Sequence, residues 1–252
     1  MVTSFLWEEA ELEQLEFYLQ ENQTKKVLDV GTGVGNFIFL LTQALKNYDE
    51  IIGIDTSERA IEIAKSYFTD NQGVRFLKMN GEHIEYPNGY FDAISLSNSL
   101  HHLADAKTIF NEMERVLKPN GLILIHEMIS NPLNLQQESH KLIHHFSAEI
   151  DRYLGLTHDE TYTKEEIEER LSKYTQCILE DSWIPQHHEK HEFSADEIEQ
   201  IIQSVNQMVL RIKDNEQISY FETKAESIKK YIAENGFDLA PQYMFILRKQ
   251  DV

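Results

Sequence analysis

The stretch Val27-Leu28-Asp29-Val30-Gly31-Thr32-Gly33-Val34-Gly35 decides the fold class of this chain. Its first four residues are mostly apolar and rich in β-branched side chains, which predicts a buried strand. Three glycines on alternate positions follow, and residues 36–45 then have the apolar spacing of a helix. Glycine lets the backbone turn sharply and lie against a ligand. The helix after such a turn points its free N–H groups and positive dipole end at that ligand.

A second feature lies at a matching distance along the chain. The expected strand Glu50–Ile54 ends at Asp55, which follows Gly35 by 20 residues. At this separation an acidic side chain reaches the ribose hydroxyls of a bound nucleoside. A tight turn without a ligand is the alternative for the glycines alone. The two features together predict nucleoside binding.

Composition and charge limit the classes of protein and of partner. The chain has 252 residues, 41% of them hydrophobic, which suits a globular protein with a sizeable core. Its 23 basic and 43 acidic residues give a formal net charge of −20, which disfavours nucleic acid and an anionic membrane as partners. A single cysteine, no basic leader and no apolar run of about 20 residues predict a cytoplasmic protein.

Apolar strands and amphipathic helices alternate up to residue 125, which predicts a parallel sheet covered on both faces by helices. Ligands bind such sheets beyond the carboxyl ends of the strands. The expected strands after the first are 50–54, 74–77, 91–96 and 122–125, and the expected helices are 36–45, 58–68 and 105–117, the last ended by the turn 119–121. The polar or glycine-rich strand ends are 31–35, 55–56, 80–83, 97–102 and 126–128.

The remaining segments predict a single domain over residues 1–252. In it an N-terminal helix (1–22) precedes a cofactor-binding core (about 25–130), and a helical lid with insertions covers about 131–235. Capping boxes at 163–166 and 194–197 mark helix starts. Further expected elements are helices at 5–21, 134–154, 163–174, 194–213 and 218–235, and strands at 177–184 and 243–247.

Four motifs, in order, resemble those of the class I S-adenosylmethionine-dependent methyltransferases, in particular the UbiE-like, small-molecule branch (methyltransferase type 11). They lie at residues 27–35, 53–57, 80–92 and 114–121. The resemblance implies an α/β, Rossmann-like, seven-stranded and mostly parallel sheet whose last strand is antiparallel. It also implies S-adenosylmethionine as cofactor and methyl transfer to a small-molecule acceptor.

The same resemblance assigns the cofactor-binding residues. Gly31, Thr32 and Gly33 would lie under the methionine and ribose. Asp55 would bind both ribose hydroxyls. Where the family commonly has Asp, Asn80 could still accept from the adenine amino group through its carbonyl oxygen. The full implied set is Asp29, Gly31, Thr32, Gly33, Asp55, Thr56, Asn80, Gly81, Glu82 and Ser97, with the turn at Ser97 holding the methionine ammonium through backbone carbonyls.

Catalysis would need little covalent help from the protein. A sulfonium methyl is already activated, so the rate of in-line displacement depends on holding the nucleophile behind it. A general base is needed only for an acceptor that arrives protonated. His101, His102 and Glu127 lie at strand ends and are the candidates for contacting the acceptor. A structural hydrogen bond is the alternative for each.

Eleven histidines include two groups after the fifth strand. A metal held between the groups, with Glu127 as a further ligand, could orient the acceptor. Solvated surface histidines are the alternative, and no metal ligand is assigned. The groups are His140, His144 and His145, and His187, His188 and His191.

Two other functions use the same features. A nicotinamide-dependent oxidoreductase shares the glycines and the acid, but the pattern here is G-x-G-x-G and not G-x-G-x-x-G. A non-catalytic regulator that binds S-adenosylmethionine would keep both features.

Overall fold

The computed structural model describes residues 9–185, 192–212 and 216–251. Within these residues, seven strands form one sheet in the order β3-β2-β1-β4-β5-β7-β6. The pairs of β7 with β5 and with β6 are antiparallel, and the other neighbours are parallel. The predicted Rossmann-like, mostly parallel sheet is therefore confirmed. The strands are β1 (Lys26–Val30), β2 (Glu50–Asp55), β3 (Val74–Lys78), β4 (Phe91–Ser97), β5 (Leu117–Met128), β6 (Ile178–Trp183) and β7 (Gln242–Arg248).

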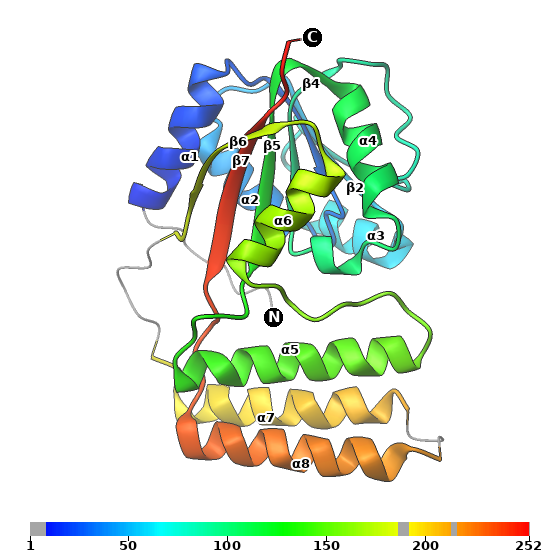
Figure 1. Ribbon diagram of the computed structural model, residues 1–252, viewed down its shortest axis with the longest axis vertical. Coiled ribbons are helices and arrows are strands. Elements are labelled where there is room, and N and C mark those ends of the chain that lie inside the picture. The colour runs from blue at the N-terminus through cyan, green and yellow to red at the C-terminus, as the bar shows by residue number, and fades with distance from the viewer. Residues whose placement is uncertain (1–8, 186–191, 213–215, 252) are drawn as a thin grey trace.

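Helices cover both faces of this sheet (Figure 1). Helices α1 (Glu9–Glu21), α2 (Asn36–Ala44) and α3 (Glu58–Tyr67) share one apolar cluster with alternate strand residues such as Val27. Helices α4 (Ala106–Val116) and α6 (Lys164–Tyr174) share a second cluster with the intervening strand residues, such as Leu28. Side chains of successive strand residues point to opposite faces, so two cores form on one sheet.

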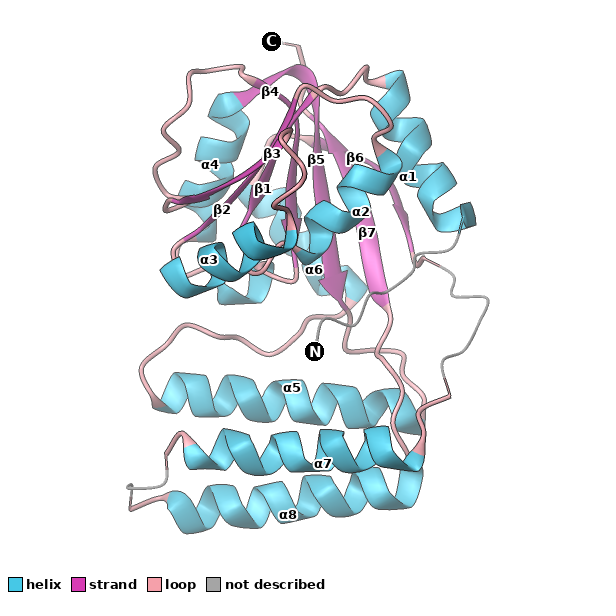
Figure 2. Ribbon diagram, turned by 180° about the vertical axis from the view of Figure 1, so that it is seen from behind, coloured by secondary structure: helices cyan, strands magenta, loops and turns pink. Residues whose placement is uncertain are grey.

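Three further helices pack on one another in a separate layer with its own apolar cluster, which includes Phe146 and Phe221. They are α5 (Leu135–Tyr153), α7 (Ala195–Leu210) and α8 (Ile218–Asn235). This α5–α7–α8 layer lies across the carboxyl ends of the parallel strands, with α5 nearest to them (Figures 1 and 2). A ligand bound at those strand ends would therefore lie beside α5.

The fifth strand is longer than predicted. The sequence Pro119-Asn120-Gly121 was expected as a turn before a strand starting at Leu122, whereas β5 already begins at Leu117. Its pairing with β4 shifts register between Phe91 and Ala93, and Asn120 has a φ of 62°. The predicted turn is thus an irregularity within the strand. Among the described residues, none of the helices has the length and apolar character to cross a membrane.

Candidate cofactor and acceptor site

The glycine loop between β1 and α2 has a left-handed backbone at each glycine. The φ angles of Gly31, Gly33 and Gly35 are 68°, 53° and 88°. A Cβ on Gly33 would have no atom within 4 Å, so this position borders open space. A Cβ on Gly31 would lie 2.6 Å from the Oγ of Ser99. The loop is therefore bare on the side where a ligand would lie and tightly packed against the turn after β4.

The carboxylate of Asp55 lies against this loop. Its Oδ2 accepts a hydrogen bond from the Gly33 N–H at 2.9 Å, and its Oδ1 accepts one from the Ser57 N–H at 2.8 Å. Each carboxylate oxygen has two acceptor sites, so both oxygens can still accept from a ribose hydroxyl. Thr56 is exposed beside it. The glycine loop and Asp55, which the spacing in the sequence singled out, are thus in direct contact.

Two residues of the implied set are buried, one at the end of β1 and one within the loop. Asp29 is 1% exposed, and its Oδ1 accepts a hydrogen bond from the Ser95 hydroxyl at 2.6 Å. Burial raises the pKa of Asp29 to about 6, although the hydrogen bond from Ser95 favours the ionised form. Thr32 is also buried, and its N–H donates to the Ile54 carbonyl at 3.0 Å. Thr32 therefore ties the loop to the end of β2, and Asp29 is held beneath the loop by Ser95.

The end of β3 supplies the next polar group. Asn80 and Glu82 are exposed, and the Asn80 Oδ1 accepts from the Glu82 N–H at 3.0 Å. Gly81 between them is buried, and a Cβ there would lie 3.1 Å from the Val30 side chain. The segment packs against the end of β1 while the Asn80 side chain faces outward.

The turn after β4 is fastened to the glycine loop. The Ser99 hydroxyl donates to the Gly31 carbonyl at 3.1 Å. The Ser97 hydroxyl instead shares a hydrogen bond with His126 Nδ1 at 3.1 Å. Sequence reasoning missed Ser99, although it lies within the polar strand end 97–102. The role of Ser99 in joining the turn to the glycine loop is seen only in the structure.

Comparison with known proteins agrees with this geometry. Residues 28–125 match a family described as a methyltransferase domain. This part of the chain therefore has the domain of the class I S-adenosylmethionine-dependent methyltransferases, and the relatives that it matches are of the UbiE-like type. The matched region ends before the α5–α7–α8 layer begins.

Individual relatives are similar to this chain over only part of its length. Demethylmenaquinone methyltransferase of Lactococcus lactis is 29% identical over 118 residues, which are 46% of this chain and 47% of the relative. The uncharacterized methyltransferase YcgJ of Bacillus subtilis is 30% identical over 102 residues, 40% of this chain and 39% of the relative. The chain thus spans about half the length of the curated relatives it matches, or less. The crystal structure of YcgJ is 17% identical over 97% of this chain and 100% of its own, with a TM-score of 0.58, and shares the fold.

At the turn after β4, His101 and Glu127 are buried together, each 1% exposed. Glu127 Oε2 lies 2.9 Å from His101 Nδ1, and its Oε1 accepts from the N–H groups of Ser99 and Leu100, each at 2.7 Å. Both side chains therefore brace the turn after β4. This arrangement supports the structural alternative for them over direct contact with the acceptor.

The third candidate, His102, is exposed at the same turn. Its ring centroid lies 4.0 Å from that of His158 and 4.4 Å from that of His101. Partial desolvation by its neighbours and the nearby rings of His101 and His158 lower the pKa of His102 to about 4. A neutral, exposed imidazole can contact an acceptor, but it is a weak base at neutral pH.

The first predicted histidine group is divided. His140 Nδ1 accepts from the Ala240 N–H at 3.0 Å, and His145 Nε2 lies 2.8 Å from the Thr161 hydroxyl. His144 faces His101 and His158 instead. The three members of this group therefore have different partners in the structure. The second group, His187, His188 and His191, lies outside the described residues.

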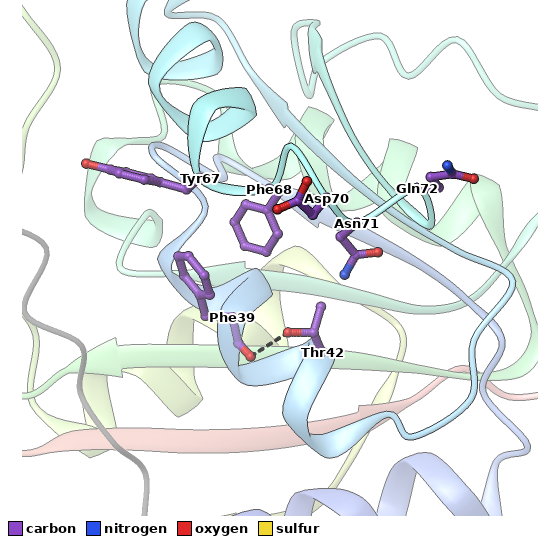
Figure 3. Close-up of a pocket in the computed structure, with 7 residues that line it drawn as sticks. All are labelled: Phe39, Thr42, Tyr67, Phe68, Asp70, Asn71 and Gln72. Carbon is purple, nitrogen blue, oxygen red and sulfur yellow. Dashed lines mark hydrogen bonds between the residues drawn. The ribbon is translucent and has the colours of Figure 1, made fainter.

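A separate hollow of about 500 Å³ lies on the flank of the sheet, between α2 and the segment after α3 (Figure 3). The Thr42 hydroxyl on its wall donates to the Phe39 carbonyl at 2.8 Å. Neither the glycine loop nor Asp55 is among its lining residues, so this hollow is distinct from the candidate cofactor site. The lining residues are Phe39, Thr42, Tyr67, Phe68, Asp70, Asn71 and Gln72.

Proposed function

We propose that this protein transfers the methyl group of S-adenosylmethionine to a small-molecule acceptor. The observation that carries the proposal is the contact between Asp55 and Gly33, with its 2.9 Å hydrogen bond. It joins a carboxylate with free acceptor sites to a loop whose central glycine borders open space. This combination fits the ribose of an adenosyl group.

In this proposal the chain positions the reactants. Bound S-adenosylmethionine supplies a methyl group on a positively charged sulfur, already activated for displacement. Asp55 accepts from the ribose hydroxyls, and Asn80 accepts from the adenine amino group. Backbone carbonyls of the turn after Ser97 hold the methionine ammonium. Glu127 keeps that turn in place through its hydrogen bonds to Ser99 and Leu100.

The acceptor would lie between the strand ends and the α5–α7–α8 layer. Of this region, the ends of β1 to β4 fall within the family match, and the end of β5 and the α5–α7–α8 layer do not. Relatives whose names specify demethylmenaquinone make quinols and phenols the first acceptors to test. The net charge of −20 favours neutral or cationic acceptors over anionic ones.

Calorimetric titration with S-adenosylmethionine and S-adenosylhomocysteine tests the cofactor half. We expect the wild type to bind both, and Asp55→Ala to lose at least tenfold in affinity, because hydrogen bonds to a charged group contribute about 1.5–3 kcal/mol each. Asp70→Ala is the control, since Asp70 is an exposed acid on the flank of the sheet. A wild type that binds neither compound, or an Asp55→Ala variant that binds like the wild type, would refute the assignment.

A screen with labelled cofactor tests the transfer itself. Phenols, quinols, thiols, amines and carboxylates are supplied in turn, and formation of S-adenosylhomocysteine is measured. Turnover with one class supports the proposal. Tight cofactor binding with no turnover in any class would indicate a non-catalytic binding module. Thermal stabilisation by NAD and not by S-adenosylmethionine would instead favour an oxidoreductase.

A further inference from the structure

Three histidines from different segments converge beside the end of β4. His101 lies in the short 3-10 helix Leu100–His102, His144 lies in α5, and His158 lies in the segment between α5 and α6. Their ring centroids are 4.9 Å (His101–His144), 5.1 Å (His144–His158) and 5.4 Å (His101–His158) apart. The cluster therefore joins the sheet domain to the α5–α7–α8 layer.

Each of these rings turns a buried nitrogen to the others. His101 Nε2, His144 Nδ1 and His158 Nε2 are buried and have no hydrogen-bond partner within the described part of the chain. One ligand atom from each ring lies within 4.8 Å of those of the other two. Buried polar atoms are rarely left unpaired, and such an atom in a native structure points to a missing water or ion.

The opposite nitrogens of two rings are held by carboxylates. His101 Nδ1 lies 2.9 Å from Glu127 Oε2, and His158 Nδ1 lies 2.6 Å from Asp151 Oδ2. A carboxylate takes the N–H of the neutral ring, so in both residues the lone pair lies on Nε2, which faces the cluster. Metal-binding histidines are oriented by this same pairing with carboxylates.

The segments that carry the rings are also fastened to one another. The Asp159 N–H donates to the His101 carbonyl at 2.7 Å, which ties the segment of His158 to the turn of His101. The Arg152 guanidinium donates to the His158 carbonyl at 2.7 Å. Asp151 lies seven residues after His144, on the same side of α5. The cluster is thus held in place before any ligand binds.

We propose that His101 Nε2, His144 Nδ1 and His158 Nε2 bind one divalent transition-metal ion of the Zn²⁺ type. Imidazole nitrogens suit zinc, cobalt, nickel and copper, whereas magnesium and calcium require oxygen ligands. In a triangle with 4.8 Å sides the centre is about 2.8 Å from each corner, so each nitrogen moves inward by less than about 1 Å to reach the Zn–N distance of about 2.0–2.1 Å. The carboxylates of Glu127 and Asp151 balance the charge of the ion.

Three protein ligands leave a fourth tetrahedral position for water or another small ligand, as in catalytic zinc sites. The exposed ring of His102 lies beside the cluster. The turn of His101 is joined to the glycine loop through Ser99 and Gly31. The ion would therefore lie on the acceptor side of the strand ends. Metal binding does not depend on the methyl-transfer proposal, because it requires neither cofactor nor turnover.

The test is titration of the whole, chelator-treated protein with Zn²⁺ by calorimetry, without S-adenosylmethionine. We expect one ion per chain in the wild type and at least a tenfold weaker affinity in His144→Ala. His145→Ala is the matched control, since His145 is the next residue of the same helix and bonds to Thr161. A variant with Asn at 187, 188 and 191 is a second control and should bind like the wild type.

His144→Ala could lose metal binding simply because it fails to fold. A second variant, which should gain a new absorption band, separates this case from the loss of a ligand. In His144→Cys a thiolate replaces the imidazole, so Co²⁺ should give a sulfur-to-cobalt charge-transfer band that the wild type lacks. The proposal is overturned if the wild type binds no Zn²⁺, if His144→Ala binds like the wild type, if binding is lost in the 187/188/191 variant, or if the cysteine variant gives no such band.

Discussion

Glu127 on β5 lies 2.9 Å from His101 Nδ1, and the same carboxylate accepts the backbone N–H groups of Ser99 and Leu100. One buried side chain therefore fixes the turn that follows β4. This turn contacts the glycine loop through Ser99 and carries His101 toward α5. Glu127 thus links the glycine loop to the part of the candidate site that faces α5.

Replacing Glu127 by Gln should lower the free energy of unfolding by about 2–4 kcal/mol. Three N–H donors converge on the carboxylate, and an amide offers only one oxygen, so at least one buried donor loses its partner. Urea denaturation measures the change. Glu62→Gln, at an exposed ion pair with Lys65, should stay within about 0.5 kcal/mol of the wild type. Equal stability of Glu127→Gln and the wild type would contradict this account of the turn.

Gly33→Ala should abolish cofactor binding without unfolding the protein. Its Cβ meets no protein atom within 4 Å and would occupy the space proposed for the ligand. Gly89→Ala is a matched control, because Gly89 has a similar φ of 63° and lies before the amino end of β4. Both variants should lose about 1 kcal/mol of stability to backbone strain. Only Gly33→Ala should lose affinity for S-adenosylmethionine by calorimetry, and equal affinities would contradict the placement of the cofactor.

The contact between the glycine loop and Asp55 could be predicted from the sequence better than the surroundings of Glu127 and His101 could. Gly33 and Asp55 were found because periodicity places each at a strand end, and the ends of parallel strands meet at one edge. The burial of Glu127 depends on its pairing opposite Tyr243, a contact between distant segments. His158 was not singled out from the sequence. No feature of the residues around it indicates that the chain folds back to place its ring beside that of His101.

Asp29→Asn should stabilise the protein at neutral pH. Burial raises the pKa of Asp29 from 3.8 to about 6 in the folded state, so the stability it contributes below pH 3.8 is lost as the pH rises through about 6. An amide stays neutral, and its oxygen can still accept from the Ser95 hydroxyl. Relative to the wild type, the free energy of unfolding of the variant should therefore rise by about 2–3 kcal/mol between pH 4 and pH 7.5. Urea denaturation at both pH values measures the difference in the free energy of unfolding between the two proteins. If this difference is the same at both pH values, ionisation of Asp29 does not destabilise the folded state.

His140→Asn should reduce the free energy of unfolding that the protein loses as the pH falls. Burial lowers the pKa of His140 from 6.5 to about 4, and its Nδ1 accepts from the Ala240 N–H, which only an unprotonated nitrogen can do. The unfolded state takes up a proton below pH 6.5 while the folded state does not, so stability present above pH 6.5 is lost as the pH falls to about 4. An Asn oxygen can accept the same hydrogen bond without titrating. The two proteins should differ in stability by a constant amount above pH 7, and the variant should lose about 2–3 kcal/mol less on going to pH 4. Parallel curves of unfolding free energy over that range would mean that His140 is protonated in the folded protein and that its bond to Ala240 is absent in acid.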